Sequence, residues 1–216
     1  MIDDQMEERD TVAMSFDVNT ETLDRLAGSW RIYQLRYGHR FSTDDVLTAW
    51  TGLLARPDAQ RVLDLGAGVG SVGLITLHGL AEQAVLTSVE VQQVSMALAR
   101  RTVAHNQLEQ RVDVRLGDLR DRAILQGDPP FDLVVANPPY LPEGSATRSP
   151  NPQRAAARLE LHGDVFDYCL TAVRHLAPGG RFCFSHAARD PRPASAIQAA
   201  GLCLISRREV FFRQDR

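Results

Sequence analysis

Four short apolar segments constrain the fold of this chain more than any other feature. They occupy residues 61–65, 84–90, 112–116 and 131–136, and stretches that can form helices or turns separate them. Apolar runs of this length, rich in β-branched residues, predict strands buried on both faces. Their alternation with helices predicts an α/β fold, with a doubly wound, mostly parallel sheet and helices on both faces. The 216 residues, 44% of them hydrophobic, suffice for one good-sized core.

The fourth segment ends in the tetrapeptide Asn137-Pro138-Pro139-Tyr140. Two consecutive prolines cannot continue a strand or a helix, so the chain must leave the sheet at its carboxyl edge, where open α/β sheets bind ligands. The Asn137 side-chain oxygen and the Pro138 carbonyl could both accept hydrogen bonds from a substrate amine. The Tyr140 ring could stack on a planar substrate. An ordinary strand exit stopped by prolines is the simpler alternative.

The first segment ends in a glycine-rich turn. Asp64 is followed by the turn residues Gly66, Ala67, Gly68 and Gly70, in the sequence DLGAGVG. Gly66 and Gly68 would let the backbone pass close to a ligand, and the later glycines would allow tight packing of helix against strand. Such a turn also suits a dinucleotide site. The absence of a following lysine excludes a phosphate-binding P-loop.

Together, the turn and the tetrapeptide resemble the motifs of class I S-adenosylmethionine-dependent methyltransferases that act on NH2 groups. That group includes adenine-N6, cytosine-N4 and protein-glutamine enzymes. The sequence LDRL at residues 23–26, followed by QLRYGHRFSTDDVL at residues 34–47, further resembles the N-terminal region of the bacterial valine-tRNA adenine-N6 methyltransferases. The resemblance covers about residues 21–205 and implies a Rossmann-like methyltransferase core.

This resemblance implies S-adenosylmethionine as the cofactor. Phe41, Thr43 and Asp44 would lie near its methionine end, and Asp118 would accept from its adenine amine. Glu90 ends the second predicted strand, about where an acid binds ribose hydroxyls in nucleotide-binding α/β folds. A solvated carboxylate at position 90 and a helix N-cap at position 118 are the structural alternatives. The expected cofactor-binding residues are Phe41, Thr43, Asp44, Asp64, Gly66, Ala67, Gly68, Gly70, Glu90, Val91, Gly117, Asp118, Leu119 and Asn137.

A long segment rich in Pro, Ser, Gly and Arg, residues 141–158, follows the tetrapeptide. Arg148, Arg154 and Arg158 make it basic, so we expect a substrate-side lid that contacts phosphates. A solvated loop whose arginines serve solubility explains the same pattern almost as well. The sequence ARLE at its end resembles a motif of the same family, which implies a function for Arg158 and Glu160. Tyr140 and these four residues form the expected substrate-binding set.

The N-terminal region is expected to cover the sheet. Residues 1–20 read as an acidic, flexible tail, and residues 21–216 as a single methyltransferase domain, with its core from residue 58. Residues 30–35 alternate apolar and polar side chains and predict a strand, and a hairpin turn is expected near Gly38. Ser42 and Asp45 have capping-box spacing and predict the start of a helix. The expected buried face of that helix comprises Val46, Leu47, Trp50, Leu53 and Leu54.

Further elements follow from the same patterns. Helices are expected at residues 92–107, 164–176 and 193–200, the first with Val94, Leu98 and Val103 facing inward. A fifth strand is expected at residues 181–186 and a last one at residues 202–212. Class I methyltransferases normally end in an antiparallel strand pair, and only one member is visible here, so that pair is reduced or truncated. His39 is taken as structural, since a lone histidine usually is.

Charge and cysteine content narrow the functional classes. The net charge of −3 combines about −7 in residues 1–24 with about +4 in the remainder, and all 24 basic residues are arginine. Arginine suits phosphate contact and base stacking, so nucleic-acid binding is permitted. Cys169, Cys183 and Cys203 lie far apart and predict buried thiols, with no disulfide or metal site. Neither a membrane-spanning run nor a signal-peptide pattern occurs, which predicts a soluble, cytoplasmic protein.

We therefore expect methyl transfer from S-adenosylmethionine to an exocyclic amine, namely adenine N6 of tRNA or another structured RNA. The target base would have to be unstacked to enter the pocket, which favours a single-stranded loop. Protein glutamine-N5 methylation of the release-factor type is the alternative within enzymes. A catalytically silent binding module that keeps the methyltransferase fold is the alternative outside them.

Overall fold

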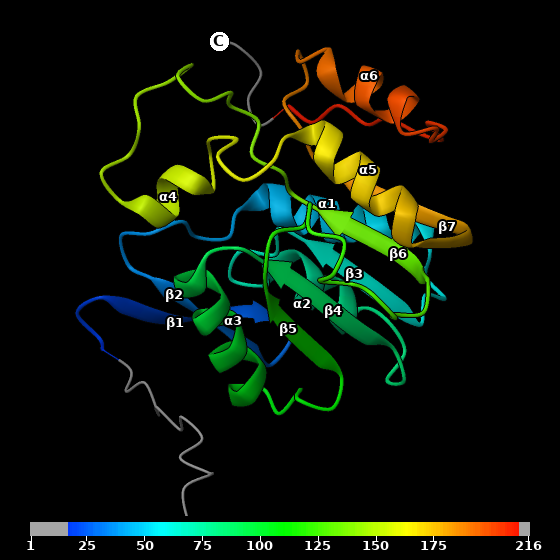
Figure 1. Cartoon of the computed structure of the whole chain (residues 1–216). Helices are drawn as coiled ribbons and strands as arrows, with labels where there is room; N and C mark the ends of the chain where they lie inside the picture. Colours follow the sequence, from blue (N-terminus) through cyan, green and yellow to red (C-terminus); the bar gives the residue numbers. More distant parts are fainter. Residues whose placement is uncertain (1–16, 212–216) are drawn as a thin grey trace, which may run out of the picture.

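Five parallel strands form the central sheet of the computed structural model, which describes residues 17–211 (Figure 1). Their spatial order is β5 (Val112–Leu116), β4 (Val85–Glu90), β3 (Arg61–Leu65), β6 (Phe131–Ala136) and β7 (Leu176–Phe184). The chain enters this sheet at its central strand, β3. The strands β4 and β5 are added on one side of β3, and β6 and β7 on the other. This order creates a topological switch point between β3 and β6, where open α/β sheets bind ligands.

Helices cover both faces of this sheet, as the sequence predicted. One face carries α1 (Thr43–Ala55), α2 (Ser71–His78) and α3 (Gln93–His105). The other carries α5 (Val165–His175), with α6 (Arg192–Ala199) packed outside it. The doubly wound parallel architecture is confirmed.

The central strands alternate their side chains between two cores. Val62 and Leu133 belong to the core beneath α1, α2 and α3. Leu63, Leu65 and Val134 belong to the core beneath α5. Successive residues of a strand point to opposite faces, so a strand covered on both sides is mostly apolar. This explains why apolar residues on both faces dominate β3 and β6.

The N-terminal hairpin turns at a different place from the one predicted. β1 (Glu21–Ala27) pairs antiparallel with β2 (Trp30–Leu35), and the turn lies between them at residues 28–29. Gly28 there has a φ of 52°, a left-handed conformation that glycine adopts without strain. The prediction of a hairpin turn near Gly38 is therefore wrong.

Gly38 instead lies in the connection from β2 to α1, pressed against another part of the chain. A Cβ added there would lie 2.1 Å from the Oε1 of Gln153 and 2.7 Å from the Cβ of Leu35. Gln153 belongs to α4 (Pro152–Ala156), a short helix within the long segment after β6. Glycine is required at position 38 by this close approach and not by a turn.

The predicted capping box starts α1, but the helix buries a face that the sequence pattern did not indicate. The Ser42 backbone N–H donates to Asp45 Oδ2 at 2.8 Å, as the spacing predicted. Three large side chains of the expected buried face are exposed instead, and these are Val46, Trp50 and Leu54. The buried residues are Asp45, Thr48, Ala49 and Gly52.

Close approach of the helix to the sheet explains this choice. A Cβ added at Gly52 would lie 3.2 Å from Val135 Cγ1 and 3.3 Å from Leu133 Cδ2. Small residues on this face let the helix backbone lie directly on β6, and larger side chains would hold it away. The same kind of misassignment occurs in α3, where Val94 is exposed although Leu98 and Val103 are buried as expected.

The C-terminal part also departs from the prediction. Residues 202–211 form no strand, and within residues 17–211 no strand follows β7. One residue of this segment contacts α1: the Arg208 guanidinium lies 4.4 Å from the centroid of the Trp50 ring. Apolar residues in it remain exposed, because an alternating pattern forms a strand only where a neighbouring strand pairs with it. Cys203 is accordingly exposed, against expectation, whereas Cys169 is buried and Cys183 is partly buried.

Some expectations lie outside the described residues. The acidic tail was placed at residues 1–20, of which only residues 17–20 are described, and these form a turn before β1. All three cysteines are described, and each is a free thiol. None of the helices between residues 17 and 211 is both long and apolar enough to cross a membrane.

An ion pair between two largely buried side chains joins the N-terminal hairpin to α3. Arg101 donates to both carboxylate oxygens of Glu21, at 2.7 and 2.9 Å. Only 17% of the Arg101 side chain and 10% of the Glu21 side chain are exposed. The same guanidinium lies 4.3 Å from the centroid of the Tyr33 ring on β2. This bidentate pair fixes the hairpin to the layer of helices.

Glu21→Ala should lower the free energy of unfolding by about 2–3 kcal/mol, because it leaves the largely buried Arg101 charge without its partner. Urea unfolding followed by circular dichroism measures the change. Glu209→Ala is the matched control, since the Arg207–Glu209 pair is exposed and should contribute less than about 1 kcal/mol. Equal losses in the two variants would contradict this account of the hairpin.

Candidate functional site

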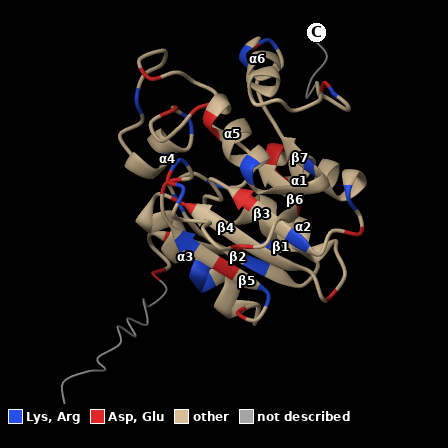
Figure 2. Cartoon of the chain, turned by 45° about the vertical axis from the view of Figure 1, so that its right-hand side comes forward, with Lys and Arg blue, Asp and Glu red and all other residues tan. Residues whose placement is uncertain are grey.

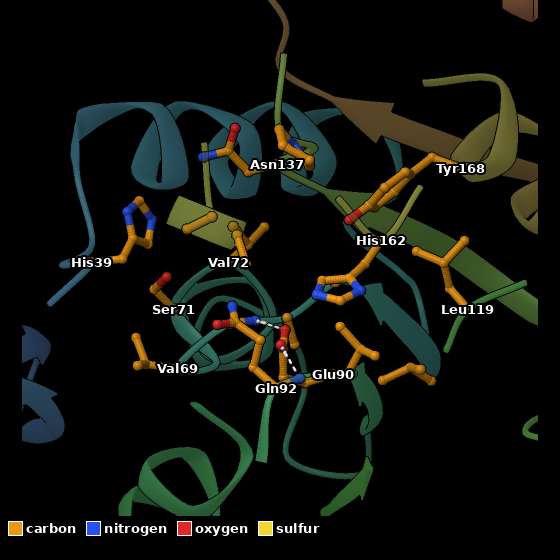
Figure 3. A pocket seen from close by; sticks show the side chains of 18 of the residues that line it. His39, Val69, Ser71, Val72, Glu90, Gln92, Leu119, Asn137, His162 and Tyr168 are labelled. Carbon is orange, nitrogen blue, oxygen red and sulfur yellow. Dashed lines mark hydrogen bonds between the residues drawn. The ribbon is translucent and has the colours of Figure 1, made fainter. Parts of the chain in front are cut away.

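A pocket lies at the carboxyl ends of the parallel strands, across the switch point between β3 and β6 (Figure 3). Its empty volume is about 770 Å³, open mouth included. The turn after β3, the end of β4 and the exits of β5 and β6 form its walls. The lining residues from these segments are Gly66, Ala67, Gly68, Val69, Ser71, Val72, Val89, Glu90, Val91, Gln92, Gly117, Leu119, Asn137 and Pro139.

The glycine turn has one glycine that faces the protein and one that faces the pocket. Gly66 has a φ of 64°, and a Cβ there would lie 2.1 Å from the hydroxyl of Tyr168 on α5. Gly68 has a φ of 57°, and a Cβ there would meet nothing within 4 Å. Gly66 therefore permits packing of the turn against α5. Gly68 leaves the space that a ligand would occupy.

The Glu90 carboxylate holds this turn to the end of β4. Its Oε2 accepts from the Gly68 backbone N–H and its Oε1 from that of Gln92, both at 2.7 Å (Figure 3). The side chain is buried, and burial raises its pKa above that of an ordinary glutamate. The carboxylate thus lies in the pocket wall and is already hydrogen-bonded to the backbone.

Asp64 lies behind the turn and does not line the pocket. Its Oδ2 accepts from the Gly73 backbone N–H at 2.8 Å, which ties β3 to the first turn of α2. Its Oδ1 is buried without a hydrogen-bond partner. Burial raises the pKa of this carboxyl to about 8. Its position indicates support of the turn, and its contact with a cofactor stays a prediction.

Asn137 lies at the pocket wall with both ends of its amide engaged. Its Nδ2 donates to Asp45 Oδ1 at 2.7 Å, and its Oδ1 accepts from the Ser185 hydroxyl. Pro139 lines the pocket beside it, whereas Pro138 and Tyr140 do not. Tyr140 is 40% exposed, and its ring meets the edge of His186 with 6.1 Å between centroids. The tetrapeptide therefore divides between the pocket and its outer rim.

Other expected cofactor residues lie outside the lining. Phe41 packs against the small core that contains Ile32 and Leu98. Thr43 and Asp44 lie in the first turn of α1, and Gly70 begins α2. Asp118 pairs with Arg120 at the rim, and this hydrogen bond lowers its pKa. No helix lies between Asp118 and β6, so Asp118 does not cap a helix.

The expected substrate residues Arg148, Arg154, Arg158 and Glu160 do not line the pocket. Arg148, Arg154 and Arg158 are exposed on the segment that carries α4. Arg154 and Arg158 line a second, smaller hollow in that segment. Glu160 forms an ion pair with Arg192 of α6, so its carboxylate is engaged within the chain.

The segment that carries α4 closes over the pocket through one buried side chain. Gln153 donates from Nε2 to the Ser95 hydroxyl on α3 at 3.1 Å and accepts at Oε1 from the His39 backbone N–H at 3.0 Å. Ala156 and Ala157 beyond it line the pocket. Three segments far apart in sequence are thereby held together above the strand ends (Figure 1).

Several lining residues were not predicted: some adjoin the predicted turn and strand ends, and the others come from segments that tertiary contacts bring to the pocket. They are His39, Asp45, Val69, Ser71, Val72, Val89, Gln92, Ala156, Ala157, His162 and Tyr168. His39 was expected to be structural, yet it lies in the wall, where burial lowers its pKa. Only Asp45 had a local signal, its capping-box spacing, and that signal indicates a helix start and no site.

The described residues hold no cluster of side chains suited to a metal ion. Residues 41–188 match the model of the family described as "Methyltransferase small domain". The chain belongs to this family.

Curated relatives agree with this assignment. A protein of Aeromonas salmonicida named tRNA1(Val) (adenine(37)-N6)-methyltransferase is 31% identical over 147 residues, which cover 68% of this chain and 58% of the relative. A Porphyromonas gingivalis protein of the same name is 31% identical over 173 residues, which cover 78% and 66%. The chain thus spans about 58–66% of the length of these relatives.

Solved structures support the fold of this methyltransferase-family chain. TrmN from Thermus thermophilus aligns with a TM-score of 0.50 at 21% identity, covering 72% of this chain and 40% of that one. At this level of identity the likeness concerns the fold alone.

Asp64 should make stability depend on pH near neutrality. The folded state keeps the Asp64 proton up to a pKa of about 8, whereas the unfolded chain releases it near about 3.9. The free energy of unfolding should therefore fall as the pH rises from about 6 to about 8, by at most about 1.4 kcal/mol per unit from this group, and level off above. Asp64→Asn, which can still accept from Gly73, should make this slope shallower, while Glu90, whose pKa burial also raises, keeps its share.

Urea unfolding between about pH 6 and about pH 9 measures the effect. Glu109→Gln serves as the control, because Glu109 is exposed and should leave the slope unchanged. A slope in Asp64→Asn as steep as in the wild type would show that Asp64 titrates normally.

Proposed function

We propose that this chain binds S-adenosylmethionine in the pocket and transfers its methyl group to the N6 amine of an adenine in tRNA or another structured RNA. The observation that carries the proposal is the place of Asn137, whose amide lies in the pocket wall at the exit of β6, across the switch point from the glycine turn. The names of the curated relatives support the choice of acceptor.

The pocket residues fit this cofactor. Open space at Gly68 admits a ligand close to the backbone of the turn. Glu90 provides a carboxylate at the place where ribose hydroxyls would donate. Val91, Gly117 and Leu119 would bound the adenine. When bound, the cofactor supplies an electrophilic methyl group.

The residues of this chain would act chiefly by positioning the acceptor. Asn137 Oδ1 and the Pro138 carbonyl would accept from the adenine amine and direct its lone pair toward the methyl carbon. No strong base is needed, because the amine proton can leave after transfer. The half-exposed ring of Tyr140 would hold the unstacked base at the rim.

The charge distribution suits a nucleic acid that approaches from the side of α4. Figure 2 shows acidic and basic segments interspersed over the fold. Arg148, Arg154 and Arg158 are exposed, and Arg154 and Arg158 flank Ala156 and Ala157, which line the pocket. We propose that these arginines contact RNA phosphates near the target base, which orients the substrate without reading its sequence.

Asn137→Ala should reduce methyl transfer on the order of 10²- to 10³-fold, since it removes a hydrogen-bond acceptor aimed at the reacting amine. The measurement is incorporation of tritiated methyl groups into total RNA and total protein, followed by mass spectrometry of modified nucleosides. N6-methyladenosine formed by the wild type supports the proposal. Label in protein alone would indicate a glutamine acceptor, and no label in either fraction would indicate a silent binding module.

Gly68→Ala should weaken binding of S-adenosylhomocysteine at least about tenfold, because the new methyl group would occupy the ligand's space. Isothermal titration calorimetry measures this affinity. Gly127→Ala is the matched control, since Gly127 also has a positive φ, 85°, and also has nothing within 4 Å of an added Cβ. Both variants should lose about 1–2 kcal/mol of stability through backbone strain. Equal affinities in the two variants would refute the placement of the ligand.

A further inference from the structure

We propose that Asp45 and Ser185 fix the orientation of the Asn137 amide, so that its oxygen stays available to the acceptor amine. Both are positioning residues that act through Asn137. Neither lies in the tetrapeptide or in the glycine turn. This inference rests on the proposed function and assigns two further residues to the same site.

Asp45 determines which end of the amide faces α1. Its side chain is only 4% exposed, and its two oxygens have separate partners. Oδ2 accepts from the Ser42 backbone N–H at 2.8 Å, and Oδ1 accepts from Asn137 Nδ2 at 2.7 Å. A carboxylate accepts hydrogen bonds and does not donate, so a rotated Asn137 amide would place oxygen against oxygen. Rotation is thereby excluded while Asp45 keeps its place.

Ser185 completes the arrangement from the opposite side. It follows β7, beside the end of β6, where its backbone N–H donates to the Ala136 carbonyl at 3.4 Å. Its hydroxyl donates to Asn137 Oδ1. A carbonyl oxygen has two lone pairs, so one remains for the acceptor amine. The amide is held by α1 at its nitrogen and by the residue after β7 at its oxygen.

The orientation matters chemically because the two ends of an amide have opposite hydrogen-bonding capacity. With the oxygen toward the acceptor, Asn137 can accept from an adenine N–H. With the amide rotated, its NH2 group would face the NH2 group of the acceptor, donor against donor, and the amine would lose a contact that directs its lone pair. A misplacement of this kind costs on the order of 10²-fold in rate.

A purely structural role for Asp45 is the competing explanation, since it also caps α1. The chain offers a matched control in α5, where Asp167 stands at the same position of a second capping box. Its Oδ2 accepts from the Asp164 backbone N–H at 3.2 Å, and it does not line the pocket. Asp167→Asn therefore makes the same substitution at an equivalent cap without touching Asn137.

The experiment combines steady-state kinetics of RNA methylation, calorimetric affinity for S-adenosylhomocysteine, and urea unfolding. In Asp45→Asn, residue 45 can pair with either rotamer of the Asn137 amide. We expect kcat to fall on the order of 10²-fold, with affinity for S-adenosylhomocysteine within about threefold of the wild type. Ser185→Ala should lower kcat by a smaller factor, roughly tenfold, because Asp45 still disfavours rotation. Asp167→Asn should leave kcat within about twofold while destabilising the fold about as much as Asp45→Asn.

Exchanging the carboxylate and the amide between positions 45 and 137 gives a second, independent test of the inference. Asn137→Asp alone sets two carboxylates against each other and should be unstable and inactive. In the double variant Asp45→Asn/Asn137→Asp, the new amide at position 45 donates to the new carboxylate, which has an oxygen on either side. We expect kcat to recover at least about tenfold over both single variants. The unfolding equilibrium constant should be at least about tenfold smaller than the single variants predict if their effects were additive.

Three results would overturn the inference. One is an affinity loss in Asp45→Asn as large as its loss of kcat, which would make Asp45 a cofactor ligand. Another is a kcat in Asp45→Asn equal to that in Asp167→Asn, which would leave capping as its only role. The third is a double variant whose change in unfolding free energy equals the sum of the changes in the two single variants. If wild-type protein methylates no RNA, the proposed function fails separately, and the unfolding data still test whether residues 45 and 137 are coupled.

Discussion

The hydrogen bonds of one buried carboxylate, that of Glu90, determine the shape of the pocket. Burying a carboxylate is costly unless donors compensate for lost water, and here two backbone N–H groups do so at 2.7 Å each. One donor belongs to the glycine turn after β3 and the other to the residues after β4, so a single side chain sets the distance between two walls. The turn can reach that carboxylate because Gly66 and Gly68 adopt left-handed backbone conformations. Residues that follow other strands are then added around this fixed pair.

Much of the fold was predictable because its central strands are covered on both faces. Such strands are mostly apolar on both faces, and this pattern can be seen in β3, β4 and β6 without reference to any partner, although Asp64, Ser88 and Glu90 are buried polar exceptions. The face of α1 could not be predicted this way. Gly52 and Ala49 are buried because they are small, while Trp50 and Leu54 are exposed, so apolarity indicated the wrong side of the helix. The close approach of α1 to the sheet decided which residues are buried, and the free energy gained by burying large apolar side chains did not. That approach depends on which element lies opposite the helix. The same reason applies to residues 202–211, where an alternating pattern had no strand to pair with.

Some residues of the candidate site could likewise be predicted from local sequence patterns, and others could not. Gly68, Glu90, Leu119 and Asn137 all follow parallel strands, and such residues meet at one edge of the sheet whatever the loops between them do. Strand order alone therefore places them in the pocket. Asp64 belongs to the same motif by sequence, but it lies before the turn and points toward α2, so its carboxylate serves the backbone. His39, Gln153 and Tyr168 come from segments whose positions depend on long-range hydrogen bonds or helix packing. No pattern within their own segments marks them.

The first turn of α1 links helix formation to the chemistry of the pocket. One carboxylate, Asp45, both caps the helix and engages the amide of Asn137, and it can do both because its two oxygens face different partners. A cap alone could be supplied by several residue types. The need to accept from Asn137 as well restricts position 45 to a side chain with an acceptor at both places, and burial restricts it to one that is fully hydrogen-bonded. The exposed face of the same helix is under no such constraint. The part of α1 that matters for function is therefore its first turn, although its largest side chains lie elsewhere.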